Sequence, residues 1–140
     1  MSSAVDKNID KYTLFFDGCS KGNPGKSGAG AVLYKNDIEL WSQAYFVGEK
    51  QTNNYAEYMG LIIGLEEAVK KKLSSLTVKG DSLLVIKQMS GSYKVNSPNI
   101  IGLYKRATEL AKHIKCIEFI HVYRVDNKRA DALSNDGLLI

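Results

Sequence analysis

Four acidic residues stand where apolar, strand-like runs end or where helical segments begin, a pattern that can carry chemistry. They are Asp17, Glu57, Asp81 and Asp131. Carboxylates brought close together repel one another, so they persist only when protons or cations neutralise them. Oxygen ligands favour Mg²⁺ or Mn²⁺ over zinc, and two such ions can activate a water and stabilise the leaving oxygen of a phosphodiester. These residue types therefore predict metal-dependent phosphodiester hydrolysis, if the fold brings the four together.

Hydrophobic patterning divides the chain into strands and helices that must position these acids. Strands are expected at residues 12–17, 28–34, 38–46, 76–81 and 116–125, and helices at residues 55–73, 82–89 and 97–113 and in a last segment that Asn127 caps. Within the first helix, small residues recur every four positions, at Ala56, Gly60, Gly64 and Ala68. Such a row favours very close packing against a sheet.

The order of these elements predicts the topology. Short links make the first three strands an antiparallel meander, and a right-handed crossover then places strand four beside strand one. We therefore expect an α/β fold with a mixed five-stranded sheet in the order 3-2-1-4-5, with strand two antiparallel and helices packed on it. The carboxyl ends of four strands meet at one edge of this sheet, where open α/β sheets bind ligands. The four acids should converge there, with Asp17 ending strand one.

Length and composition describe a single globular domain. The chain has 140 residues, a net charge of +4 and 44% hydrophobic residues, which excludes a disordered chain and a disulfide scaffold. We expect residues 1–10 to be a flexible N-terminal tail and residues 11–140 to be one catalytic domain. No apolar run is long enough to span a membrane, and no secretory signal is present, so we expect an intracellular, cytoplasmic protein without membrane contact. No heptad pattern appears, which predicts a monomer.

The two cysteines, Cys19 and Cys116, lie far apart and have no metal-binding spacing. We expect two reduced thiols packed as small apolar groups rather than a redox or metal site. The basic balance of the chain favours a polyanionic partner.

Four motifs in order resemble the type 1 ribonuclease H (RNase HI) family. They span residues 17–25, 52–57, 80–82 and 127–131, and the resemblance covers about residues 11–136. It implies an RNase H-like fold and an endonuclease that cuts the RNA strand of RNA–DNA hybrids, leaving 5′-phosphate and 3′-hydroxyl ends. The four acids match the family's metal ligands, which implies two Mg²⁺ ions, with Mn²⁺ able to substitute.

The same resemblance implies residues that bind the substrate. Asn23, Asn53 and Asn54 would contact the RNA strand, whose 2′-hydroxyls face the wide minor groove. Gly18 is a further candidate substrate-binding residue. Thr52 matches a position that holds a DNA-strand phosphate. A second interpretation also fits these residues, in which Asn23 belongs to a turn and Asn53 or Asn54 caps a helix.

The chain departs from the family pattern between residues 90 and 96, where the basic protrusion of the well-known bacterial form is missing. The resemblance therefore identifies a minimal form of the family. Tyr93 and Lys94 are candidates to replace the protrusion in substrate binding, although Tyr93 could instead lie in the core and Lys94 in solvent. Asn99 is a candidate to complete the phosphate site.

A second departure concerns the segment before Asp131, where many relatives carry a histidine that assists product release. His121 stands ten residues before Asp131 but lies within an apolar strand-like run, which favours a structural role. Arg124 is nearer the loop and could steer the departing phosphate, although it cannot act as a base. We therefore choose Arg124, rather than His121, as a catalytic residue in addition to the four acids.

Two other functions are compatible with these motifs. One is a related nuclease of the same fold that acts on double-stranded RNA or on junctions. The other is a catalytically silent nucleic-acid-binding domain, which usually lacks one of the acids. All four acids are present here, and the asparagines at 23, 53 and 54 favour a substrate with an RNA strand.

Overall fold

The computed structural model describes residues 9–140. Most of the expected tail, residues 1–8, therefore lies outside the described residues. The strands are β1 (Tyr12–Lys21), β2 (Gly25–Lys35), β3 (Ile38–Gln51), β4 (Ser75–Gly80) and β5 (Cys116–His121). The helices are α2 (Asn53–Lys70), α3 (Leu83–Met89), α4 (Pro98–Ala111) and α5 (Lys128–Asp136), with short 3-10 turns η1 (Arg124–Asp126) and η2 (Gly137–Leu139).

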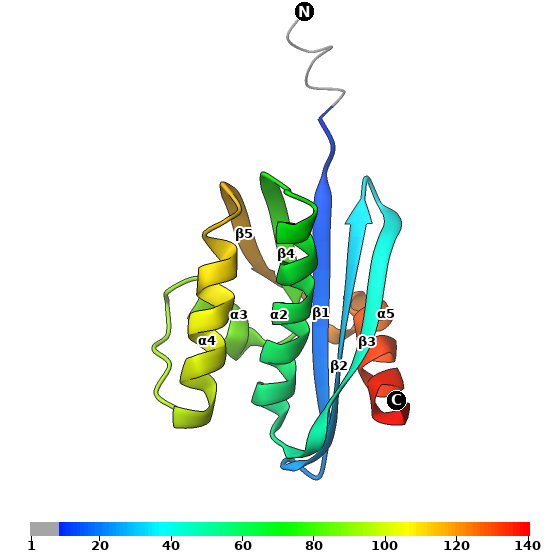
Figure 1. The fold of residues 1–140 in the computed structure, drawn as a ribbon, viewed down its shortest axis with the longest axis vertical. Coiled ribbons are helices and arrows are strands. Elements are labelled where there is room, and N and C mark those ends of the chain that lie inside the picture. The colour runs from blue at the N-terminus through cyan, green and yellow to red at the C-terminus, as the bar shows by residue number, and fades with distance from the viewer. Residues whose placement is uncertain (1–8) are drawn as a thin grey trace, which may run out of the picture.

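The five strands form one mixed sheet in the order β3-β2-β1-β4-β5, which confirms the predicted topology. β2 pairs antiparallel with both β1 and β3, whereas β4 pairs parallel with β1 and with β5. Helices α2 and α4 lie in front of the sheet and α5 lies behind it (Figure 1). The sheet is therefore the middle layer of the domain.

Two apolar clusters hold these layers together. The larger one joins the sheet to α2, α3 and α4 and includes the fully buried side chains of Leu14, Phe16 and Leu61. The smaller one joins β2 to α5 through Val32, Ala130 and Leu133. Among residues 9–140, no helix is both long enough and apolar enough to span a membrane.

The first strands are longer than the sequence predicts. β1 runs to Lys21, so the expectation that Asp17 ends strand one is wrong. What ends near Asp17 is the parallel pairing of β1 with β4, whose last pair joins Phe16 to Gly80. Beyond that pair, β1 stays paired with β2, and β2 with β3, so the sheet continues there as three antiparallel strands. Asp17 therefore still lies at the edge where β4 stops.

The end of β5 also differs from the prediction. The strand stops at His121, and Arg124 to Asp126 form the turn η1 instead of continuing the strand. The backbone N–H of Val122 still donates to the carbonyl of Gly80 at 2.9 Å. The chain therefore leaves the sheet beside the carboxyl end of β4, next to Asp81.

The row of small residues on α2 packs against the sheet, as predicted. A Cβ atom added to Gly60 would lie 2.4 Å from the backbone oxygen of Asp17, and one added to Gly64 would lie 2.6 Å from the Leu14 side chain. Real Cβ atoms do not approach backbone atoms so closely. Glycine at position 60 therefore lets α2 lie directly on β1.

Replacing Gly60 by alanine should lower the free energy of unfolding by about 2 kcal/mol or more, because the methyl group would push α2 away from Asp17. Gly102, in the middle of α4, is a matched control, since an added Cβ there meets nothing within 4 Å. Gly102→Ala should raise stability by roughly 0.5–1 kcal/mol through helix propensity. Urea unfolding of both variants checks the pair, and equal effects would contradict the packing argument.

The two cysteines are free thiols in different surroundings. Cys19 is half-buried, and its thiol lies 3.4 Å from the carbonyl oxygen of Ser134. Cys116 is exposed, so the expectation that it packs as a small apolar group is wrong. It begins β5, the edge strand of the sheet.

Candidate active site

Three of the predicted acids meet at one point of the structure. Carboxylate oxygens of Asp17, Glu57 and Asp81 all lie within 4.8 Å of one another. Asp17 comes from β1, Glu57 from the first turns of α2, and Asp81 from the residue after β4. Asp131, near the start of α5, lines the same cavity and interacts with the Asp17 carboxyl. The four acids therefore gather as the topology predicts.

Gly18 makes this meeting possible. A Cβ atom at this position would lie 2.3 Å from the backbone nitrogen of Glu57, so any side chain would displace the start of α2. The N–H of Gly18 also donates a hydrogen bond of 2.9 Å to Oδ1 of Asp17. This glycine therefore brings Glu57 against Asp17 and orients the Asp17 carboxylate.

Burial and mutual repulsion raise the pKa values of these acids. Asp17 is only 5% exposed, and its burial, together with the charge of Asp81, raises its pKa to about 7. Burial and the charge of Asp17 hold the pKa of Glu57 well above its ordinary value. Burial also raises the pKa of Asp81, although the nearby charge of Arg124 opposes the shift. At neutral pH the cluster therefore keeps protons unless a cation neutralises it.

The donor set fits a divalent cation. Oε1 of Glu57 is buried and has no hydrogen-bond partner among the described residues. A buried carboxylate oxygen without a partner is costly, and a metal ion would satisfy it. The ligands are all carboxylate oxygens, the type that Mg²⁺ and Mn²⁺ prefer. The cluster could therefore hold such an ion.

The acids line a cavity of about 580 Å³. Asn53 and Asn54 lie on one side of it, and His121 and Arg124 also line it. His121 is half-buried, and its ring meets the ring of Tyr123 edge to face at 5.5 Å. Arg124 is exposed and acts electrostatically on Asp81. Both His121 and Arg124 can therefore reach the cavity, and the choice of Arg124 stays a prediction.

A second hollow, of about 530 Å³, brings together the residues expected to bind nucleic acid. It is lined by Asn23, Thr52, Asn53, Asn54, Ser97, Asn99 and Ile100. Asn53 and Asn54 line both this hollow and the acid cavity. A chain of polar groups therefore runs from the acids to Asn99, at the start of α4.

Hydrogen bonds at the start of α2 fix this polar hollow. The Thr52 hydroxyl accepts from the backbone N–H of Tyr55 at 3.2 Å, so Thr52 is the N-cap, and the expectation of a cap at Asn53 or Asn54 is wrong. The side-chain oxygen of Asn23 accepts from the backbone N–H of Asn53 at 2.9 Å. Asn23 lies in the turn between β1 and β2, as the second interpretation holds. The hairpin tip is thereby tied to the helix start.

Tyr93 and Lys94 lie apart from both hollows. They line a separate surface depression with Val95, Ile101 and Tyr104. Tyr93 is 50% exposed, so the alternative that it lies in the core is wrong. Lys94 is exposed as well. That Tyr93 and Lys94 bind substrate stays a prediction, and any such contact would lie outside the polar hollow.

Two residues at the site are not found by the sequence reasoning. Asn127 is the N-cap residue of α5, as expected, but its side chain makes no cap hydrogen bond. It is 1% exposed, and its side-chain amide donates to the carbonyl of Phe16 at 3.0 Å. Asn135 lines the acid cavity and donates to the carbonyl of Asp131 at 3.0 Å. Its spacing of four residues from Asp131 on one helix is the signal that could have revealed it.

Comparison with known proteins identifies the family of this chain. The family model "Reverse transcriptase-like" matches residues 15–137. A bifunctional protein of Mycobacterium tuberculosis is 42% identical over 130 residues, which cover 91% of this chain and 35% of that protein. This chain thus spans about a third of the length of that relative. A ribonuclease H of Pseudomonas fluorescens is 32% identical and covers 96% of this chain, which in turn covers 94% of it.

Solved structures give the same result. The N-terminal RNase H domain of the Mycobacterium tuberculosis protein, solved as a fusion with maltose-binding protein, superposes with a TM-score of 0.88 at 42% identity, covering 93% of this chain and 94% of that one. LC11-RNase H1, solved in complex with an RNA/DNA hybrid, gives 0.85 at 30% identity, covering 91% and 96%. The resemblance carried by the four motifs is thereby confirmed, and the chain belongs to the ribonuclease H family of enzymes.

Proposed function

We propose that this chain is an endonuclease that hydrolyses the RNA strand of RNA–DNA hybrids by a two-metal-ion mechanism, leaving 5′-phosphate and 3′-hydroxyl ends. One observation carries the proposal. The carboxylates of Asp17, Glu57 and Asp81 converge within 4.8 Å in a cavity that adjoins a hollow lined by asparagines. A metal-binding cluster beside neutral hydrogen-bonding groups suits cleavage of a phosphodiester that is read through sugar hydroxyls.

The four acids Asp17, Glu57, Asp81 and Asp131 would hold two Mg²⁺ ions, which Mn²⁺ could replace. When bound, such ions supply an activated water and stabilise the charge on the leaving oxygen. The protein's own contribution is to keep the carboxylates close and largely shielded from solvent, since Asp17 is 5% exposed. Arg124 lies on the open side of the cavity, where its charge could steer the departing phosphate.

Substrate contacts follow the polar hollow away from the acids. Short amides at Asn23, Asn53 and Asn54 can donate to and accept from 2′-hydroxyls, which only the RNA strand carries. Thr52 and Asn99 lie farther along and are suited to a DNA-strand phosphate near the start of α2. Gly18 lines the acid cavity itself. Tyr93 and Lys94 would meet the hybrid beyond this hollow.

Replacing Thr52 by alanine should weaken both the helix start and hybrid binding. Loss of the N-cap leaves the N–H of Tyr55 without its partner, which should cost about 1 kcal/mol of stability. The KM for the hybrid should rise severalfold while kcat changes little, because Thr52 does not touch the acids. Thr52→Ser keeps the hydroxyl and should restore both values. An unchanged KM in Thr52→Ala would remove Thr52 from the substrate site.

Cleavage of a 5′-labelled RNA strand in an RNA–DNA hybrid tests the proposal directly. The reaction is run with Mg²⁺, Mn²⁺ or EDTA, and single-stranded RNA, double-stranded RNA, duplex DNA and a junction are tested in parallel. Metal-dependent cutting of the hybrid alone, with 3′-hydroxyl product ends, supports the proposal. Cutting of double-stranded RNA or junctions instead supports a related nuclease, and binding without cutting in either metal supports a silent binding domain.

We further propose that residues 11–140 act as one catalytic domain, that this domain is monomeric, and that it works in the cytoplasm on hybrids. Sedimentation at micromolar concentration tests the monomer, because a dimer would sediment measurably faster. The RNA/DNA hybrid bound to LC11-RNase H1 is the observation that supports this partner.

A further inference from the structure

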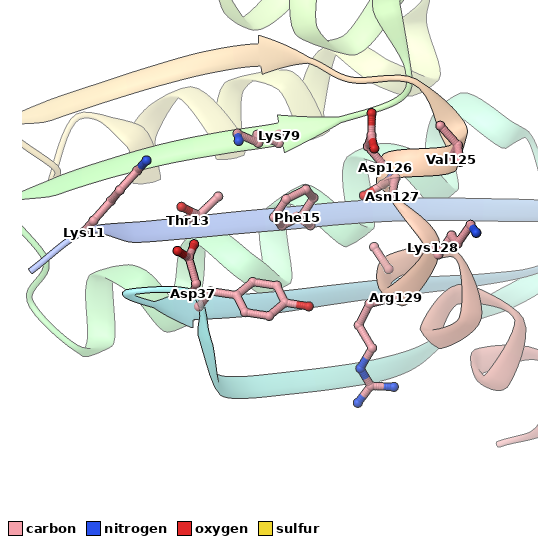
Figure 2. A pocket seen from close by; sticks show the side chains of 12 residues that line it. Lys11, Thr13, Phe15, Asp37, Lys79, Val125, Asp126, Asn127, Lys128 and Arg129 are labelled. Atoms are coloured by element: carbon pink, nitrogen blue, oxygen red, sulfur yellow. The ribbon is translucent and has the colours of Figure 1, made fainter.

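A hollow of about 350 Å³ lies on the face of the sheet that α5 covers only in part. Figure 2 shows it along β1, with Lys79 on the neighbouring strand β4 and Lys128 and Arg129 at the start of α5. No residue that lines it also lines the acid cavity. It is therefore a separate cavity that the proposed nuclease reaction does not use.

Basic side chains outnumber acidic ones in the lining of the hollow, four to two. Lys11, Lys79 and Lys128 line it, and none of the three forms an ion pair within the described part of the chain. Arg129 differs, because its guanidinium binds both carboxylate oxygens of Glu39 at 3.0 and 3.1 Å. Three lysines thus remain available to an anion.

The backbone at one wall adds to this preference. Lys128 and Arg129 form the first turn of α5, where the backbone N–H groups have no partner one turn earlier. The side chain of Asn127 does not cap them, since its Oδ1 accepts no hydrogen bond among the described residues. Uncapped N–H groups next to lysines favour a phosphate group.

The rest of the hollow contains aromatic and acidic side chains, which an inorganic anion alone would not need. Phe15 and Tyr34 lie side by side in it, with ring centroids 5.6 Å apart and planes at 84°. Nζ of Lys79 lies 5.6 Å from the centre of the Phe15 ring. Asp37 and Asp126 add acceptors at the rim. A ligand that fills this hollow needs an anionic group, an apolar planar part and hydrogen-bond donors.

We infer that this hollow binds a nucleoside monophosphate. Its phosphate would lie among Lys79, Lys128 and the start of α5, its base against Phe15 and Tyr34, and its sugar hydroxyls toward Asp126. The volume lies in the range of small-molecule sites. An extended nucleic-acid backbone or an acidic peptide fits less well, because each would bring a second anionic group toward the carboxylates of Asp37 and Asp126.

Titration of the ¹⁵N-labelled chain with adenosine 5′-monophosphate, followed by NMR, tests the inference. EDTA is present throughout, so that no metal ion can recruit the phosphate to the acid cavity. We expect saturable shifts at the amides of Phe15, Lys79 and Ala130, with a Kd on the order of a millimolar or tighter. Inorganic phosphate and adenosine, each titrated alone, should bind at least about tenfold more weakly.

Single variants locate the site. Lys79→Gln and Lys128→Gln should each weaken binding of the nucleotide roughly five- to tenfold. Lys112→Gln removes an exposed lysine at the end of α4, far from the hollow in the fold, and should bind as the parent does. Lys128 is exposed, so its variant tests the site even if Lys79→Gln folds poorly.

Several results would overturn the inference. They are no saturation at millimolar nucleotide, shifts confined to Asn23 and Thr52, and equal binding of phosphate or of adenosine alone. An equal loss of nucleotide affinity in Lys112→Gln would show that the lysine variants act only through the net charge of the chain. None of these readouts depends on cleavage, so failure here is distinguishable from failure of the nuclease proposal.

Discussion

Asp17→Asn is expected to reduce cleavage of an RNA–DNA hybrid by at least about a thousandfold, because it removes a carboxylate from the centre of the proposed metal site. Asp17 is the acid that interacts with the other three, since Glu57, Asp81 and Asp131 all influence the pKa of its carboxyl group. Asparagine has nearly the same shape but supplies no charge to hold a divalent cation. The expected loss is therefore in kcat, with hybrid binding largely kept.

The same variant should be more stable than the parent in EDTA. The parent must bury a carboxyl group that is 5% exposed and lies against other acids, whereas asparagine avoids the cost of that charge. Asp136→Asn, at the exposed end of α5, is a matched control that should keep full activity. Single-turnover cleavage and urea unfolding measure both effects. An Asp17→Asn variant that cuts at the parent's rate would contradict the metal site.

The second large effect is a loss of stability in the metal-free protein as pH rises. The folded-state pKa of Asp17 is raised from 3.8 to about 7, and that of Glu57 is raised well above 4.5. Between about pH 4 and pH 7 the folded state therefore binds more protons than the unfolded state, so the free energy of unfolding falls with rising pH. For Asp17 alone the shift corresponds to about 4 kcal/mol, as an order of magnitude.

Urea unfolding in EDTA at pH 5 and pH 8 checks this prediction. The parent should be less stable at pH 8 by a few kcal/mol, and Asp17→Asn should lose most of that dependence. Mg²⁺ should stabilise the parent more at pH 8 than at pH 5, because the ion competes with protons for the same carboxylates. A parent whose stability does not fall between these pH values would show that the acids do not interact as the structure indicates.

The sequence by itself determined the topology and the identity of the acids. Apolar runs of strand length, short links and one crossover allow only a few arrangements, and the handedness of the crossover selects the order 3-2-1-4-5. The acids that lie beside the carboxyl end of β4 and in the first turns of α2 and α5 then share one edge of the sheet. Gly60 and Gly64 likewise indicate that α2 packs closely against the sheet, because glycine in a helix interior is unfavourable without such a contact.

Other features depend on side-chain partners that are distant in the chain. Asn127 looks like a helix cap, but its amide donates to Phe16, 111 residues earlier. Asn23, at the tip of the hairpin, accepts from the backbone N–H of Asn53, 30 residues later. The exposure of Cys116 and Tyr93 depends in the same way on which elements pass over them. Local patterns cannot specify such partners.

The length of the β1–β2 hairpin is the clearest case that only the tertiary structure decided. Glycines and polar residues between positions 18 and 28 locally favour a loop, yet the two strands stay paired from Tyr12–Lys35 to Lys21–Lys26. Gly18 is required because α2 lies against it, and Gly28 because a Cβ atom there would lie 2.3 Å from the Ser134 carbonyl oxygen. Glycine is present at these positions because helices pack against the strands. In the sequence, a glycine that allows such a contact between distant segments looks the same as a glycine in a turn.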